Sequence, residues 1–251
     1  MKKGFMILKF KKYKPIFEVK DVSKSFDGRP ILKKLSVKVF PGECVGILGP
    51  NGCGKTTLFS ICIGEQSIDS GKIVLNNKSI ERIPIHIRSK EGLGYLPQQR
   101  SVFNMSVYDN ILGIAQLSIK KIEEQKKITE KLLDEFNLQH LRSLNASVLS
   151  GGEIRRLMMA RVMINKPKIV LLDEPLAALD PIVIQDIQKY ILKIQSSGTS
   201  ILVTDHNVKN LFDITDRSYV LGEQTVITEG TSREILKSSK AIEHYFGSQF
   251  N

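Results

Sequence analysis

The stretch GILGPNGCGKTT, residues 46–57, constrains the fold of this chain more than any other feature. It places four glycines within nine positions, although each glycine in an ordered segment costs about 0.5–1 kcal/mol relative to alanine. The stretch overlaps CVGIL (44–48), an apolar run bounded by Pro-Gly and Gly-Pro turns, which is typical of a strand covered on both faces. We therefore expect a strand, a loop of bare backbone, and a helix that begins at about Gly54.

The loop itself matches the phosphate-binding pattern G-x-x-x-x-G-K-[ST] as GPNGCGKT, residues 49–56. Its glycines allow backbone N–H groups to converge on phosphate oxygens, Lys55 would reach the β and γ phosphates, and Thr56 would ligate Mg²⁺. A glycine-rich turn without a ligand is the alternative interpretation. The candidate nucleotide-binding residues are Gly49, Pro50, Asn51, Gly52, Cys53, Gly54, Lys55, Thr56 and Thr57.

Hydrolysis needs further groups, and KIVLLDEP (168–175) supplies two carboxylates at the end of a second apolar strand. The carboxyl edge of a parallel sheet is where ligands bind. Asp173 can hold Mg²⁺ through water, and Glu174 can orient or deprotonate the attacking water. The sequence therefore predicts nucleotide hydrolysis rather than nucleotide binding alone.

A second set of bare-backbone positions precedes a helix in LSGGEIRRLMMARVMI, residues 149–164. Ser150 is suited to cap that helix, and Gly151 and Gly152 at its N-terminus form a second anion site. One triphosphate cannot be enclosed by both loops of a single chain, so we expect a second copy of the chain to contribute.

Together these motifs resemble the ATP-binding cassette family, the ATPase subunits of membrane transporters, over residues 16–247. The resemblance implies a homodimer with ATP at its interface, where the phosphate loop of one chain faces the signature LSGGE of the other. It implies binding roles for Phe26 on adenine, for Ser150, Gly151, Gly152 and Glu153 in the signature, and for Asp180 at the end of LAALD (176–180). It assigns catalysis to Glu174, His206, Lys55 and Gln98, and Mg²⁺ to Thr56, Gln98 and Asp173.

The same resemblance implies an α/β fold of the P-loop NTPase type, a mostly parallel sheet flanked by helices, with an antiparallel β part and an inserted α-helical subdomain. A basic arm would occupy residues 1–15, the nucleotide-binding domain residues 16–251, and the helical subdomain about 99–155. LSVKVF (35–40) alternates as a half-exposed strand does, and SILVT (200–204) is another apolar strand. Helical spacing is expected for two sets, Ile128, Leu132 and Phe136, and then Ile184, Ile187, Ile191 and Ile194 after Asp180-Pro181, ending at Gly198.

The charge, the cysteines and the apolar runs of the sequence indicate where the protein is located in the cell and which classes of partner it binds. The net charge of +11 is scattered along the chain, which favours solubility or attraction to an acidic lipid face over direct nucleic-acid binding. Cys44, Cys53 and Cys62 lack the spacing of a metal site and fit a reducing compartment. No run approaches the ~20 apolar residues of a membrane span, so a membrane role requires a partner. We expect a cytoplasmic protein.

Several longer segments resemble the ATPases of Gram-negative lipopolysaccharide exporters: residues 92–112, 173–191, 204–221 and the YFG ending. This implies a dimer on the cytoplasmic face of the inner membrane, beneath two integral membrane subunits whose coupling helices enter a groove near Gln98 and Phe103. Phe103 and Tyr108 would line that groove, or would simply pack the helical subdomain. The sequence is one residue shorter than the exporter pattern after Phe103, and Cys53 replaces a more common alanine.

Other functions remain as alternatives. The ATPase of a branched-chain amino acid importer could share every catalytic motif. A soluble family member acting on ribosomes or DNA usually carries two cassettes or a long coiled coil, whereas this chain has one phosphate loop and no sustained heptads. A regulatory cassette without hydrolysis would be expected to lack Glu174 or His206.

Overall fold

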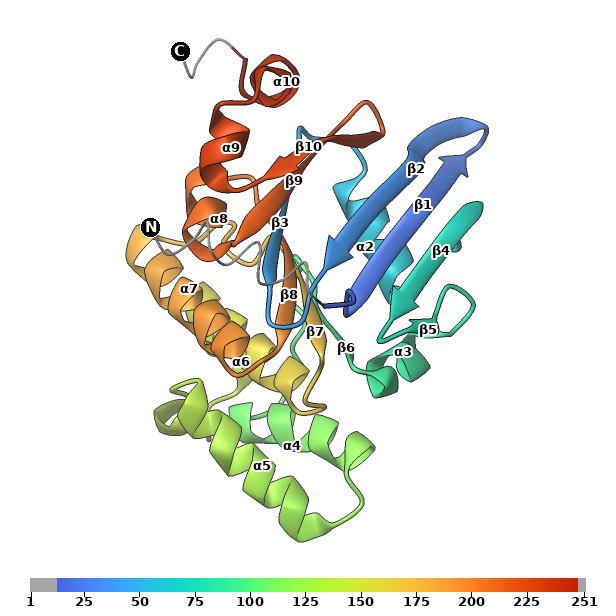
Figure 1. Cartoon of the computed structure of the whole chain (residues 1–251). Helices are drawn as coiled ribbons and strands as arrows, with labels where there is room; N and C mark the ends of the chain where they lie inside the picture. Colours follow the sequence, from blue (N-terminus) through green and yellow to red (C-terminus); the bar gives the residue numbers. More distant parts are fainter. Residues whose placement is uncertain (1–12, 248–251) are drawn as a thin grey trace.

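The computed structural model describes residues 13–247 of the chain. Within that range the strands form two sheets (Figure 1). The larger sheet has the spatial order β10 (Thr225–Gly230), β9 (Arg217–Gly222), β3 (Cys44–Leu48), β8 (Ser200–Thr204), β7 (Ile169–Asp173) and β6 (Leu93–Leu96). Its strands are parallel except for the antiparallel edge strand β10. The smaller sheet is antiparallel, with the order β2 (Arg29–Val39), β1 (Phe17–Phe26), β4 (Ser70–Leu75) and β5 (Lys78–Ser79).

The helices cover the larger sheet on both faces, which confirms the expected α/β class. Helix α2 packs between the two sheets, in one core with the buried side chains of β1, β2 and β3. The opposite face is covered by helices that share a second core with β7 and β8. The helices are α2 (Lys55–Ile63), α3 (Ile85–Glu91), α4 (Val107–Ser118), α5 (Ile122–Glu135), α6 (Gly151–Met163), α7 (Pro181–Ser196), α8 (Val208–Ile214), α9 (Ser232–Leu236) and α10 (Ser239–Ala241).

The apolar runs behave as their patterns predict. Every residue of β3, β7 and β8 is buried, because helices cover both faces of these strands. The half-exposed strand expected at 35–40 is longer than predicted, since β2 already begins at Arg29. Lys34 has a φ of 43°, which breaks the alternation there and hides the first half of the strand from a sequence pattern.

Helices α4 and α5 lie together at one end of the molecule, away from the antiparallel sheet (Figure 1). On the predicted amphipathic face, Leu132 and Phe136 are buried and Ile128 is half-buried. Both helices fall within residues 99–155, whose boundaries as a subdomain stay a prediction. Of the basic arm predicted for residues 1–15, residues 1–12 lie outside the described range.

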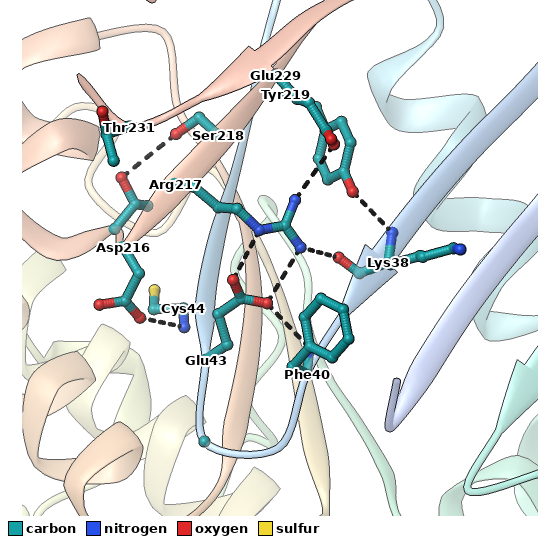
Figure 2. Close-up of polar contacts among 12 residues, drawn as sticks. Lys38, Phe40, Glu43, Cys44, Asp216, Arg217, Ser218, Tyr219, Glu229 and Thr231 are labelled. Carbon is teal, nitrogen blue, oxygen red and sulfur yellow. Dashed lines mark hydrogen bonds and ion pairs between the residues drawn. The ribbon is translucent and has the colours of Figure 1, made fainter. Parts of the chain in front are cut away.

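A buried ion pair joins the two sheets at the end of β3 that is opposite the glycine-rich loop (Figure 2). Arg217, the first residue of β9, donates from Nε to Glu43 Oε1 at 2.7 Å and from Nη2 to the Lys38 carbonyl at 2.7 Å. Lys38 belongs to β2, and its N–H donates to the Tyr219 hydroxyl at 3.1 Å. Glu43 is 1% exposed and also accepts from the Phe40 N–H.

Candidate functional site

The glycine-rich loop joins β3 to helix α2, which begins at Lys55 with Gly54 as its N-cap, as expected. Two glycines of the loop have no room for a side chain. Gly49 has a φ of 155°, and a Cβ there would lie 2.6 Å from the Leu221 carbonyl oxygen. Gly54 has a φ of 103°, and its Cβ would lie 2.6 Å from Leu32 Cδ2. The backbone is therefore bare at both ends of the loop, as anion binding by N–H groups requires.

Lys55 lies across its own loop. Its Nζ donates to the Gly49 carbonyl at 2.6 Å and to the Pro50 carbonyl at 2.9 Å, and the residue is buried. Two backbone oxygens thus hold the ammonium group in the loop. A phosphate entering the loop can exchange for them, because an anionic oxygen makes the stronger, charge-assisted hydrogen bond.

A cavity of about 230 Å³ opens beside this loop. It brings together predicted residues from three parts of the chain, because its lining consists of Phe26, Ile31, Asn51, Gly52, Gly54, Lys55, Thr56, Thr57 and Glu174. Gly49 and Pro50 contribute instead through their carbonyls to Lys55. The side chain of Cys53 is part of the buried core, and burial raises the pKa of its thiol.

Phe26 is placed where a planar ligand could stack. It is the last residue of β1, its side chain is partly exposed at the cavity, and the Lys24 ammonium lies 5.0 Å from its ring centroid. The ammonium also lies 3.6 Å from Asp69 Oδ1, and Lys24 does not line the cavity. The position fits the adenine contact implied by the resemblance.

Asp173, the last residue of β7, is held in place by neighbours. Its Oδ1 accepts from the Thr204 hydroxyl at 2.9 Å, and its Oδ2 lies 3.5 Å from the Tyr95 hydroxyl. Burial raises the pKa of this carboxyl, against the effect of both hydrogen bonds. The side chain therefore sits at the carboxyl edge of the sheet with a fixed orientation.

Glu174 is where three predicted catalytic side chains meet. Its Oε2 accepts from Gln98 Nε2 at 2.5 Å and lies 2.5 Å from His206 Nε2. Burial raises the pKa of the Glu174 carboxyl, His206 acts to lower it, and the nearby charges of Asp173 and Asp205 raise it again. A carboxylate with a raised pKa that also lines the cavity is suited to accept a proton from water.

The metal ligands predicted by sequence are hard oxygen donors of the kind Mg²⁺ prefers. Thr56 lines the cavity, Asp173 directly precedes Glu174 in the chain, and Gln98 donates from Nε2 to Glu174 Oε2. Within residues 13–247 no group of three His, Cys, Asp or Glu side chains is arranged to hold a metal ion. Mg²⁺ commonly takes only one or two protein ligands and completes its shell with water and substrate phosphates. The donor set therefore fits Mg²⁺ that arrives with a nucleotide.

The signature segment is well formed but stands apart from the cavity. Ser150 caps α6 in a capping box: its hydroxyl accepts from the Glu153 N–H, and Glu153 Oε2 accepts from the Ser150 N–H at 2.8 Å. No residue of 150–153 contributes to the cavity lining. Within one chain, the two predicted anion sites therefore remain separate.

The segment LAALD packs against the signature glycines, since a Cβ on Gly151 would lie 3.3 Å from Leu179 Cδ2. Asp180 takes the N-cap position of α7 as predicted, although its side chain makes no capping hydrogen bond. A Cβ on Gly152 would lie 2.5 Å from Val183 Cγ1, on the first turn of α7. The first turns of α6 and α7 thus lie so close at Gly152 that a side chain there would force Val183 to shift.

Some residues of the site were not predicted from sequence. Asp205 is 3% exposed, and its carboxylate accepts from the Leu176 N–H at 3.3 Å and the Asn207 N–H at 3.0 Å. It thereby ties the segment that carries His206 to the segment after Glu174. Its place directly after an apolar strand was the only signal in the sequence. Arg100 and Arg155, which contact backbone carbonyls, were also missed.

Tyr245 was missed as a neighbour of the phosphate loop. It lies in a short π-helical turn, Ile242–Phe246, near the end of the described chain, and the Gly49 backbone acts to lower the pKa of its hydroxyl. Burial raises the pKa of this hydroxyl, with smaller contributions from Cys53 and Asp205. The C-terminal part of the chain therefore packs against the start of the loop.

A second, larger cavity of about 320 Å³ lies near the segment that follows β6. It is lined by residues of α3, β6 and α6 among others, including Pro97, Ser101 and Arg161. Phe103 and Tyr108 are not in this lining. Phe103 is 44% exposed and packs on the Arg161 guanidinium at 4.4 Å, whereas Tyr108 is half-buried and packs against the core.

No helix of the described residues 13–247 has both the length and the apolar composition needed to cross a membrane.

Comparison with known proteins places the chain among cassette ATPases. The family model for ABC transporters matches residues 32–177. The chain is 38% identical to the lipopolysaccharide export system ATP-binding protein LptB of Haemophilus influenzae, over 94% of this chain and 98% of that protein. It is 40% identical to the protein of the same name from Escherichia coli K12, over 92% and 97%. The ADP conformation of MJ1267, an ATP-binding cassette of an ABC transporter, superposes with a TM-score of 0.82 at 26% identity, covering 94% of this chain and 100% of the other.

Proposed function

Because the chain belongs to the ABC transporter family as an ATP-binding subunit, we propose that it hydrolyses ATP to drive lipopolysaccharide extraction from the inner membrane and its export through membrane partner subunits. The observation that carries the proposal is the meeting of Gln98, Glu174 and His206 beside the cavity that Lys55 also lines. The curated relatives are named for lipopolysaccharide export, which favours this cargo over branched-chain amino acids.

The residues divide the work of hydrolysis among them. Lys55 exchanges its two carbonyl partners for the β and γ phosphates. Thr56, Asp173 and Gln98 would hold Mg²⁺, and the ion would supply positive charge against the phosphates. Glu174 accepts the proton of the attacking water, and His206 contacts the γ-phosphate. Phe26 stacks on the adenine ring.

The active unit is a dimer of this chain. Because the signature stands apart from the cavity in one chain, Ser150, Gly151, Gly152 and Glu153 close over the ATP bound by the second copy, and Asp180 lies at the same interface. The N–H groups at the start of α6 then face the γ-phosphate, where a helix N-terminus stabilises an anion. Each ATP thus holds two chains together.

The chain works on the cytoplasmic face of the inner membrane, bound to two integral membrane subunits. The 320 Å³ cavity beside Pro97, Ser101 and Arg161 is the docking place for their coupling helices, with Phe103 at its rim through its contact with Arg161. Because Gln98 follows Pro97 directly, a helix seated there acts on a residue that contacts Glu174.

The first test uses Glu174→Gln in the full chain, with Mg²⁺ and ATP. Removing the base is expected to lower turnover by at least about 100-fold, while ATP binding persists and light scattering detects a trapped dimer. Glu124→Gln, the same chemical change on the exposed side of α5, is the control and should behave as wild type. A Glu174→Gln chain that stays monomeric, or that still turns over ATP at the normal rate, contradicts the assignment.

The cargo is tested by purifying the tagged Glu174→Gln chain from its own membranes in detergent and identifying the co-purified proteins by mass spectrometry. Two related but distinct multi-span subunits with large periplasmic domains are the expected result. Permeases with a periplasmic amino acid receptor would replace the export proposal with the importer. Ribosomes or DNA would overturn the transporter proposal.

A further inference from the structure

Two arginines connect the segment around Gln98 to the signature segment by hydrogen bonds. One arginine belongs to the signature helix and the other to the Gln98 segment, and each bonds to the other segment. Arg155 projects from α6 and is 9% exposed. Its Nη1 donates to the Pro97 carbonyl at 3.0 Å, and its Nη2 donates to the Gln98 carbonyl at 3.2 Å. A side chain of the signature helix thus fixes the main chain at Pro97 and Gln98.

Arg100 makes the return contact. It lies two residues after Gln98, and its Nη2 donates to carbonyls of the segment that leads into the signature, Ala146 at 3.0 Å and Ser147 at 3.1 Å, with the Leu149 carbonyl at 3.5 Å. Arg100 itself is exposed. We call this pair of arginines the arginine clamp.

The chemistry of the clamp favours rigidity. All acceptors are backbone carbonyls, so the contacts depend on the path of the chain rather than on the rotamer of an acceptor side chain. A guanidinium presents several N–H groups in a fixed plane, which allows one arginine to hold two carbonyls where lysine offers a single point charge. The acids Asp205, Asp173 and Glu174 also attract the charge of Arg155.

The clamp completes a continuous path through the chain. Glu174 Oε2 bonds the Gln98 side chain, the Gln98 carbonyl bonds Arg155, and Arg155 belongs to the helix that Ser150 caps. We propose that Arg100 and Arg155 are positioning residues that make the Gln98 segment and the signature move as one body. This inference rests on the proposed dimer. In that dimer the ATP bound by a chain fixes the position of Gln98 in the same chain, while the signature of that chain binds the ATP of the partner. The clamp therefore couples the two ATP sites.

Arg100→Met tests the clamp in the full chain, because the exposed position tolerates the change without a buried cavity. Arg100→Lys keeps the charge but replaces the planar guanidinium with a shorter ammonium side chain. Arg233→Met removes an exposed arginine on α9 and controls for loss of charge. The first measurement is the affinity for a fluorescent ATP analogue at protein concentrations where the chain is monomeric. The second is the ATP concentration at the midpoint of dimer formation in the Glu174→Gln background. The third is the Hill coefficient of hydrolysis in chains that keep the natural Glu174.

The clamp predicts a split among these readouts. In Arg100→Met, analogue binding by the monomer stays within about twofold of wild type. The ATP midpoint for dimer formation rises about tenfold, which is the loss expected for charge-assisted bonds on an exposed surface. The Hill coefficient of hydrolysis falls toward one. Arg100→Lys is intermediate, and Arg155→Lys shows the same pattern. Arg233→Met changes nothing.

Two results overturn the inference alone: an Arg100→Met chain whose dimer midpoint and Hill coefficient equal those of Arg233→Met, or one that loses monomer binding as strongly as dimer formation. If the Glu174→Gln chain with Arg100 intact forms no dimer with ATP, the proposed function fails and the clamp fails with it. The two failures are thus distinguished by the chain that carries only Glu174→Gln.

Discussion

Glu174 occupies a backbone conformation that a glutamate rarely adopts. Its φ is 49°, in the left-handed region, which costs on the order of 1 kcal/mol or more for a residue with a side chain. The conformation is held by the Glu174 N–H, which donates to the Thr204 carbonyl at 3.1 Å and lies 3.2 Å from the Thr204 hydroxyl. This bend turns the side chain out of the strand direction and toward Gln98 and His206.

The charges around Glu174 predict a pH dependence. Glu174 acts as a base in its deprotonated form, so kcat/KM rises with pH through its pKa and is lost as pH falls through it. Burial, Asp173 and Asp205 raise that pKa, so the loss starts at a higher pH than for an ordinary glutamate. Asp205→Asn removes one like charge and should move the acidic limb of the kcat/KM profile to lower pH.

Asp213→Asn, an exposed change on α8, is the control for the pH profile and should leave the acidic limb in place. If the limb of Asp205→Asn does not move, or moves upward, then Asp205 does not act on Glu174 through charge.

The residues predicted from sequence share one property: each belongs to a motif of adjacent residue types. Lys55, Asp173 and Glu174 could be predicted because a glycine loop, or an apolar strand followed by acids, is visible along the chain. Arg100 and Arg155 act on backbone carbonyls, which every residue has, so their partners leave no pattern. Tyr245 lies near Gly49 only because the fold brings a C-terminal turn next to a loop from the first quarter of the chain.

At the scale of elements, β6 and α6 approach each other at Gly94. A Cβ on Gly94 would lie 2.7 Å from Val162 Cγ1. Gly94→Ala should therefore lower the free energy of unfolding by about 1–3 kcal/mol, as overpacking does, measured by urea denaturation. The same change pushes β6, which leads to Gln98, away from the signature helix, so hydrolysis should fall as well.

The Gly94 clash has an internal control. Val162→Ala removes the nearest methyl group, so the double variant Gly94→Ala/Val162→Ala should be more stable than Gly94→Ala alone. A double variant that loses the sum of both single effects would show that the two side chains are independent.

Element boundaries could be predicted where a cap marks them. The start of α7 at Asp180-Pro181 and the cap of α6 at Ser150 agree with the sequence, because proline and serine have strong preferences at these positions. The end of α7 agrees as well: the helix ends at Ser196, Ser197 is its C-cap, and Gly198 directly after it has a φ of 96°, as a helix-stopping glycine does. The start of β2 was missed because a positive φ at Lys34 interrupts its pattern.

At the scale of the whole molecule, the buried ion pair of Figure 2 holds the two sheets together. Arg217→Met would leave Glu43, 1% exposed, as an unpaired charge in the core. Removing one partner of a buried pair costs about 3–5 kcal/mol, and the lost bond to the Lys38 carbonyl acts in the same direction. We expect a lower urea midpoint of unfolding, with ATP binding retained by the fraction that is folded.

The double variant Glu43→Met/Arg217→Met removes both charges. Because an apolar pair can replace a buried ion pair with little loss, it should unfold at a higher urea concentration than Arg217→Met. A double variant less stable than the single one would show that Glu43 stabilises the sheets without Arg217.

The order of strands within the sheets could not be predicted from local patterns, since β3 pairs with β8 and β9 from far along the chain. The fold class came instead from the order of motifs and the family they resemble. The separation of the signature from the cavity within one chain was expected on the same basis, since one triphosphate cannot meet both loops.

In the chain without nucleotide, Lys55 bonds to its own loop, so a ligand must displace these bonds before the lysine can bind it. A nucleotide that enters must offer the Lys55 ammonium better oxygens than the two carbonyls that it already contacts at 2.6 and 2.9 Å. A nucleoside has no phosphate and offers nothing for that exchange, whereas a triphosphate supplies anionic oxygens in place of neutral ones. The idle loop therefore favours ligands that carry phosphate, because an anionic oxygen makes a stronger hydrogen bond to the ammonium than the two carbonyls do.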